Sequence, residues 1–157
     1  MSSNVRITQT TTTTTTASIL VINTGYLKTK FGLLKSLIFV LTLISFILMS
    51  VRHRNLISYN DFLFLYLINW CHLYAIFLML LTCLFSLSTA SLMPKMTFDF
   101  VFHFTATILF LLAGLWSISI AIDSYYATYK TASVLAFIIA LLHALHGYFS
   151  YATCKLH

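Results

Sequence analysis

Acidic residues are scarce in this sequence, and glutamate is absent. The 157 residues include three acidic and nine basic side chains, so that only 8% of the chain is charged. Soluble globular proteins carry about 25% charged residues. Together with 60% hydrophobic residues and a mean hydropathy of +0.94, this composition excludes an ordinary soluble domain. It predicts an integral membrane protein with room for one helical bundle.

Cysteine, glycine and proline are also few, at three, four and one residues. Cys71, Cys83 and Cys154 have no paired spacing, which excludes a disulfide framework and a C-x-x-C redox motif. The single proline leaves the long apolar runs unbroken, unlike the interrupted helices that commonly build transporter sites.

Neither a catalytic set nor a metal or haem set is predicted. Of the four histidines in apolar runs, we expect His72 near the outer leaflet and His103, His143 and His146 nearer the inner one. No carboxylate or thiolate completes a recognisable ligand set with them. No nucleophile has a base and an orienting partner at a sensible depth. The expectation is therefore no enzyme, no cofactor and no metal.

The net charge of +6 indicates membrane orientation and lipid contact rather than nucleic-acid binding, because no aromatic-lined basic groove accompanies it. Lys28, Lys30 and Lys35 are predicted to lie at headgroup level, where each is worth about 1 kcal/mol against anionic lipid. The alternative is a plain topogenic flank. Expected partners are membrane lipids, among them cholesterol or anionic inner-leaflet lipids, other membrane proteins, and a second copy of the chain.

The N-terminal segment 1–24 is predicted to be disordered or weakly ordered. It contains an unbroken threonine run from Thr10 to Thr16, and a single-residue repeat cannot build a specific packed core.

Four apolar runs follow, at about 32–51, 62–90, 100–122 and 131–151. Each has at least the roughly 20 residues that a helix needs to cross a bilayer. A short turn at 91–97 and a tail at 152–157 complete the chain. The side that holds the N-terminus, the second loop and the tail carries six basic residues, against three on the other side. The positive-inside rule therefore predicts that both termini are cytoplasmic.

Each run has a face of small or mildly polar residues at helical spacing. These faces predict an all-α, integral membrane four-helix bundle, since small residues let helices approach closely in lipid. The first face is Lys35, Ile38, Thr42, Ser45, Met49 and Arg52, and the second is Asn69, His72, Ala75, Met79, Thr82, Ser86 and Ala90. The third is Asp99, His103, Ala106, Phe110, Ala113, Ser117 and Ala121, and the fourth is Ala132, Ala136, Ala140 and Ala144, with His143 and Gly147 close by.

The intramembrane polar residues have two interpretations. Asn69, His72, Asp99, His103 and His143 either form interhelical hydrogen bonds, at about 0.6 kcal/mol each, or build a proton path. Asn69 and His72 are expected toward the outer end of the second run. Asp99 and His103 are spaced for an i,i+4 contact. Cys154, beside Lys155 near the expected cytoplasmic surface, is a candidate for palmitoylation.

Three stretches resemble the MARVEL family of four-span membrane proteins. They are Tyr26–Leu34 (YLKTKFGLL), Phe98–Ser117 (FDFVFHFTATILFLLAGLWS) and Tyr126–Tyr148, which begins YATYKTASVLAFIIALLH. Within the family, the chain is most similar to the chemokine-like-factor branch and to a member that acts in myoblast fusion. The resemblance implies cytoplasmic termini, residence in the plasma membrane or trafficking vesicles, and no catalytic residues.

The favoured hypothesis is a non-enzymatic membrane-organising protein in vesicle trafficking, membrane apposition or cell-cell fusion. The alternative is a small transporter or proton-conducting protein that uses Asp99, His103, Asn69 and His72. Measurement of flux in liposomes distinguishes the two hypotheses.

Overall fold

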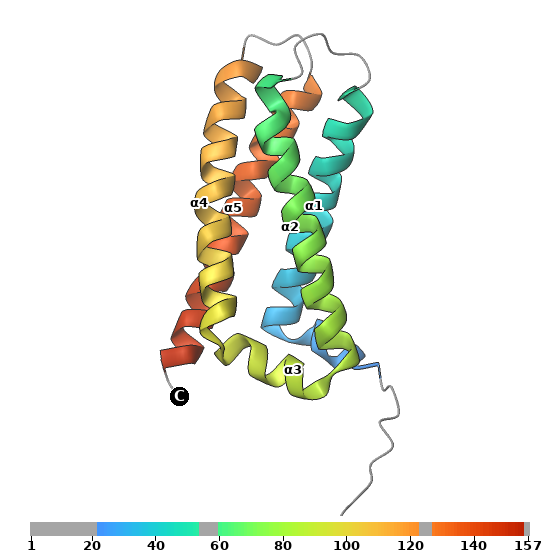
Figure 1. Ribbon diagram of the computed structural model, residues 1–157, viewed down its shortest axis with the longest axis vertical. Coiled ribbons are helices and arrows are strands. Elements are labelled where there is room, and N and C mark those ends of the chain that lie inside the picture. Colours follow the sequence, from blue (N-terminus) through green and yellow to red (C-terminus); the bar gives the residue numbers. More distant parts are fainter. Residues whose placement is uncertain (1–21, 54–59, 123–126, 156–157) are drawn as a thin grey trace, which may run out of the picture.

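A computed structural model describes residues 22–53, 60–122 and 127–155 of the chain, and these residues contain helices and no strand. Four helices are long and apolar enough to cross a membrane: α1 (Lys30–His53), α2 (Asn60–Phe85), α4 (Thr97–Ala121) and α5 (Ala127–Lys155). They form the upright bundle of Figure 1. The chain is a multi-pass membrane protein. The threonine run lies outside the described residues.

Neighbouring helices around the bundle are α1 and α2, α2 and α4, α4 and α5, and α5 and α1. Helix α1 therefore faces α4 across one diagonal, and α2 faces α5 across the other. The contact between α4 and α5 is the most extensive.

Short elements close one end of the bundle: the 3-10 turns η1 (Thr24–Lys28) and η2 (Met93–Lys95), and the helix α3 (Leu87–Leu92). In Figure 1, α3 crosses below the bundle at the end where α5 finishes. Because four long helices alternate in direction, residue 22 and Lys155 both lie at this closed end.

The second span is shorter than the sequence predicted. Helix α2 ends at Phe85 rather than near Ala90, because Ser86 has extended backbone (φ −139°, ψ 113°) and caps α3 by accepting a hydrogen bond from the Thr89 N–H at 3.2 Å. The expected turn at 91–97 is therefore largely α3 and η2. Helix α5 begins earlier and ends later than expected, so that residues 152–155 are helical rather than a tail.

The turn η1 fits tightly against the start of α1. Thr29 caps this helix, since its Oγ1 accepts the Gly32 N–H at 3.1 Å and donates to the Tyr26 carbonyl at 2.7 Å. A Cβ on Gly32 would stand 2.0 Å from that carbonyl oxygen, so only glycine fits here. Tyr26 is 3% exposed, and burial raises the pKa of its phenol above the ordinary value. The Asn23 N–H also donates to the Leu84 carbonyl at 2.7 Å, which ties the segment to the end of α2.

Most of the small residues on the predicted faces of α4 and α5 are buried between the helices. All six predicted packing residues are buried, namely Ala113, Ser117, Ala132, Ala136, Ala140 and Gly147. Two residues of the predicted faces are exceptions, because Ala144 of α5 and Thr82 of α2 are exposed on the outer side of the bundle. The outer surface carries large apolar side chains instead, such as Phe104, Leu141 and Tyr148. Small residues thus face the interior and large apolar residues face lipid.

Candidate functional site: a buried polar cluster

A cluster of polar side chains lies inside the bundle toward its closed end. It consists of Lys35 from α1, Asp99 and His103 from α4, and His143, His146 and Ser150 from α5, all of them 0% exposed. We call these six residues the Asp99 cluster. Asp99 stands in the first turn of α4, where the helix dipole favours a negative charge. Lys35 lies about 7.5 Å along the axis of α1 from its start.

The Asp99 carboxylate has three partners. The Lys35 Nζ lies 2.5 Å from Oδ1, while His146 Nε2 and Ser150 Oγ lie 3.0 and 2.9 Å from Oδ2. Ser150 has a second acceptor in the Pro94 carbonyl at 3.1 Å, and its single proton serves one of the two. The carboxylate is thereby bound to α1, on the diagonal of the bundle, and to the neighbouring helix α5, and its charge is balanced by Lys35.

Lys35 also lies 3.2 Å from the Met93 sulfur, and that sulfur is 3.6 Å from Cys83 Sγ. The ammonium group therefore contacts the Met93 sulfur from η2, which in turn contacts Cys83 from α2. The ion pair therefore crosses the α1–α4 diagonal inside a packed, partly sulfur-lined environment.

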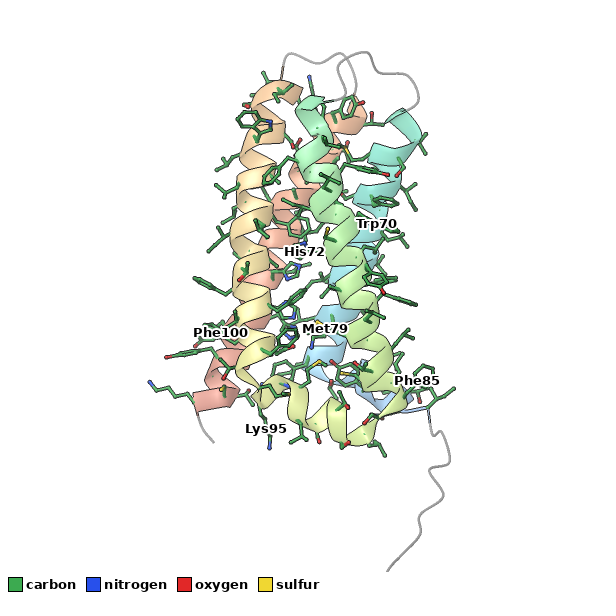
Figure 2. The ribbon with its side chains drawn as sticks, in the orientation of Figure 1. Trp70, His72, Met79, Phe85, Lys95 and Phe100 are labelled. Atoms are coloured by element: carbon green, nitrogen blue, oxygen red, sulfur yellow. The ribbon has the colours of Figure 1, made fainter. Side chains whose placement is uncertain are left out.

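The histidines continue the cluster toward the middle of the bundle. His103 Nδ1 lies 2.8 Å from His143 Nδ1, so one of the two nitrogens carries the shared hydrogen. The His103 ring stacks on the His146 ring at 3.8 Å, and the His72 ring meets the His143 ring edge-on at 5.9 Å. Figure 2 shows His72 pointing between the helices. His103 Nε2, His143 Nε2 and His146 Nδ1 have no hydrogen-bond partner among the described residues.

Asn69 and His72 make separate contacts. Asn69 Nδ2 donates to Ser45 Oγ at 3.0 Å, which is the interhelical hydrogen bond expected of a packing residue. His72 Nδ1 lies 3.0 Å from the Ile68 carbonyl, which requires the proton on that nitrogen. The prediction that His72 lies near the outer leaflet, away from the other histidines, is wrong, because His72 contacts His143.

The prediction for Lys35 is also wrong. It is not a headgroup residue but the buried partner of Asp99. Lys28 and Lys30 are exposed, and Lys30 Nζ lies 5.1 and 5.2 Å from the ring centres of Phe31 and Phe149. Cys154 is partly exposed on the last turn of α5.

The i,i+4 approach of Asp99 and His103 is present, with His103 Nε2 at 3.9 Å from Oδ1. His146 and Ser150 were missed as site residues. Both lie on the α5 face that includes His143, and their spacing of four residues was the available signal.

The cluster brings together a serine, three imidazoles and a carboxylate, but not in the serine–imidazole–carboxylate order of a catalytic triad. The Ser150 hydroxyl contacts the carboxylate rather than an imidazole, whereas an activated nucleophile needs the base as its direct neighbour. The expectation that no carboxylate completes a ligand set is corrected, because donor atoms of Asp99, His103 and His146 all lie within 4.8 Å of one another.

Compared with known proteins, the chain matches no family model, no curated protein and no solved structure.

Proposed function

We propose that this chain is a non-enzymatic multi-pass membrane protein that organises specialised membrane regions, in vesicle trafficking, membrane apposition or cell-cell fusion. The observation that carries the proposal is the contrast between the polar interior of the bundle and its apolar outer surface. The charged and imidazole groups of the Asp99 cluster bind one another inside, while the outer surface presents large apolar side chains. Such a surface associates laterally, in the plane of the membrane, with lipids and with other membrane proteins.

A groove on the outer side of α4 and α5 supports this role. It has a volume of about 340 Å³ and is lined by Gly147 and by aromatic side chains that include Phe104, Tyr148 and Tyr151. Aromatic and small residues in one groove suit close packing against an apolar neighbour in the membrane. We propose that lipids or partner helices bind along this side.

Orientation follows from the exposed lysines at the closed end. Lys28, Lys30, Lys95 and Lys155 are all exposed there, and positive loops face the cytoplasm. We propose that this end is cytoplasmic. A membrane-impermeant maleimide should label Cys154 only after the plasma membrane is permeabilised. Labelling of intact cells at Cys154 would place the closed end outside.

The function is tested by sorting. A tagged chain should concentrate at cell contacts or in vesicles, and Tyr148→Ala combined with Tyr151→Ala should disperse it. Leu141→Ala is the matched control, because Leu141 is 70% exposed on the same helix but does not line the groove. Uniform spreading of the unmodified chain over all membranes, or equal sorting of the three proteins, contradicts the proposal.

A second candidate function is favoured by the cluster itself. Titratable groups from all four long helices meet inside the bundle, since His72 of α2 joins Lys35, Asp99 and the histidines of α5. Ionisable residues within membrane spans mark proton or ion pathways in many proteins. A small transporter or proton-conducting protein would use this row of residues.

This candidate predicts proton flux in liposomes that contain the purified chain. The flux should disappear with His103→Ala and persist with Thr105→Ala, since Thr105 is exposed on the outer side of α4. If liposomes that contain the chain are no more permeable to protons than protein-free liposomes, the proton-conducting function is refuted and the membrane-organising function remains.

A further inference from the structure

Three donor atoms in the Asp99 cluster stand at the spacing of a metal site. His146 Nε2 lies 3.0 Å from one oxygen of Asp99, and His103 Nε2 lies 3.9 Å from the other. An ion bound at about 2.1 Å from each donor in tetrahedral geometry holds its ligands about 3.4 Å apart. These two distances bracket that value, and one donor atom from each of the three residues lies within 4.8 Å of the other two. Side-chain rotations that bring the three atoms closer together would close the site.

The hydrogen bond of His103 prepares its other nitrogen as a ligand. When His103 Nδ1 donates to His143 Nδ1 at 2.8 Å, Nε2 keeps a free lone pair. That Nε2 is buried, has no partner among the described residues, and faces the Asp99 carboxylate. Histidine ligands of metals almost always donate their second N–H to such a partner. His143 therefore has the place of an outer-shell partner.

His146 can change from donor to ligand at little cost. Its Nε2 now points at Asp99, while its Nδ1 has no partner in the described part of the chain. Moving the ring proton to Nδ1 frees the Nε2 lone pair and breaks no other hydrogen bond. Two imidazoles and one carboxylate are a set that first-row transition metals accept, with further positions left for water.

Lys35 opposes a cation at this place. Its ammonium group already occupies one oxygen of Asp99, and both groups are excluded from solvent. A divalent ion beside a charged lysine would be strongly repelled in this low-dielectric interior. An ion can therefore bind Asp99 only when the Lys35 ammonium group moves away from the carboxylate.

We propose that Asp99, His103 and His146 form a binding site for a divalent transition-metal ion, and that the ion and the Lys35 ammonium compete for the Asp99 carboxylate. The site is independent of the function proposed above, because neither lateral association nor sorting requires a metal. It adds a ligand-dependent state to the bundle, in which the contact between α1 and α4 is exchanged for a metal contact between α4 and α5.

The test uses the full chain without a histidine tag, stripped of metal by chelator and held in detergent micelles. Co²⁺ is the spectroscopic probe, since low-symmetry coordination by nitrogen and oxygen gives visible absorption bands, and Zn²⁺ is the competitor. The expected result is one Co²⁺ per chain, displaced by Zn²⁺. Lys35→Met removes the competing charge and should bind Co²⁺ at least tenfold more tightly than the unmodified chain.

Lys35→Met combined with Asp99→Asn is the matched control. It removes both charges together, keeps the remaining histidines of the chain, and lacks the carboxylate ligand, so that the Co²⁺ bands should be lost. His143→Phe should weaken binding about 10- to 100-fold, as the loss of outer-shell partners does, whereas His72→Phe should leave it unchanged.

The thermal midpoint gives a second measurement for variants that fold poorly. Zn²⁺ should raise the midpoint of Lys35→Met and should not raise that of the double variant. The proposal is overturned if the unmodified chain and Lys35→Met both show neither bands nor a thermal shift, or if the double variant binds Co²⁺ as tightly as Lys35→Met.

Discussion

The ion pair between Lys35 and Asp99 should be the most sensitive point of the fold. It joins α1 to α4 across the diagonal of the bundle, and the two side chains are fully buried. We consider Lys35→Met and Asp99→Asn, which remove one charge each and nearly preserve the side-chain volume, and the double variant that removes both.

The two single variants should lower the free energy of unfolding by different amounts. Removing one partner of a buried pair destabilises a protein by about 3–5 kcal/mol, because the other charge stays buried without compensation. After Lys35→Met, Asp99 retains donors in His146 and Ser150, which places this variant near 3 kcal/mol. After Asp99→Asn, Lys35 retains mainly the Met93 sulfur, which places this one near 5 kcal/mol.

The double variant should recover most of the loss. With both charges gone, no buried charge is left unpaired, and replacing a buried pair by uncharged groups is often neutral. The expected cost of the double variant is therefore about 1 kcal/mol, well below the roughly 8 kcal/mol sum of the singles.

The measurement is the free energy of unfolding in bicelles, determined for the unmodified chain and the three variants in chelator, so that metal does not contribute. A shift of 3 kcal/mol changes the unfolding equilibrium by more than a factor of 100. If the single variants are as stable as the unmodified chain, or if the double variant costs the sum of the two, the pair does not hold the bundle as the contacts indicate.

Three further predictions concern packing. The double variant Ala136→Leu, Ala140→Leu should destabilise the bundle by about 1–3 kcal/mol or more, because both sites are fully buried. The control Ala144→Leu, at an exposed site, should leave the thermal midpoint unchanged. Equal midpoints for the two proteins would contradict the packing of α5. Gly32→Ala should displace η1 from α1, because the new Cβ would lie 2.0 Å from the Tyr26 carbonyl oxygen. Proteolysis near Tyr26 should then accelerate. Gly25→Ala is the control, because the nearest atom to its new Cβ is 3.4 Å away. Asn69→Ala should cost only about 0.6 kcal/mol, the value of one interhelical hydrogen bond, and a cost above roughly 2 kcal/mol would show that Asn69 supports more than Ser45.

Helical periodicity was the most informative signal in the sequence. Every residue of the third predicted face is buried in α4, from Asp99 through Phe110 to Ala121. The α1 face is buried as well from Lys35 to Met49, while the Arg52 side chain lies outside what the structure describes. The buried part includes Lys35, for which the charge pattern had predicted headgroup contact. Position on the face was the better guide, because a lysine on an interior face close to a helix end can reach a buried carboxylate.

What periodicity could not provide is the axial alignment of one helix against another. The second span was predicted to reach Ala90, which placed its centre too far along the chain and His72 too close to the outer surface. Because α2 ends at Phe85, His72 lies near the helix middle, level with His143. The cluster depends on this alignment, and only the packed structure supplies it.

The width of an interior face was also underestimated. On α5 the buried residues extend beyond the alanine ladder to His146 and Ser150, while Ala144 is exposed. A helix that contacts neighbours on two sides buries a broader stripe than one row of small residues indicates.

The distance along the chain between Lys35 and Asp99 has a consequence for biosynthesis. The two residues are 64 positions apart, on the first and third spans, so the lysine leaves the ribosome well before its counter-ion. Until the third span is inserted, the first must either stay close to the bilayer surface, where the amine remains hydrated, or be sheltered by the insertion machinery. Nascent chains that stop short of Asp99 would expose an unneutralised lysine, a feature by which quality control could recognise and remove them.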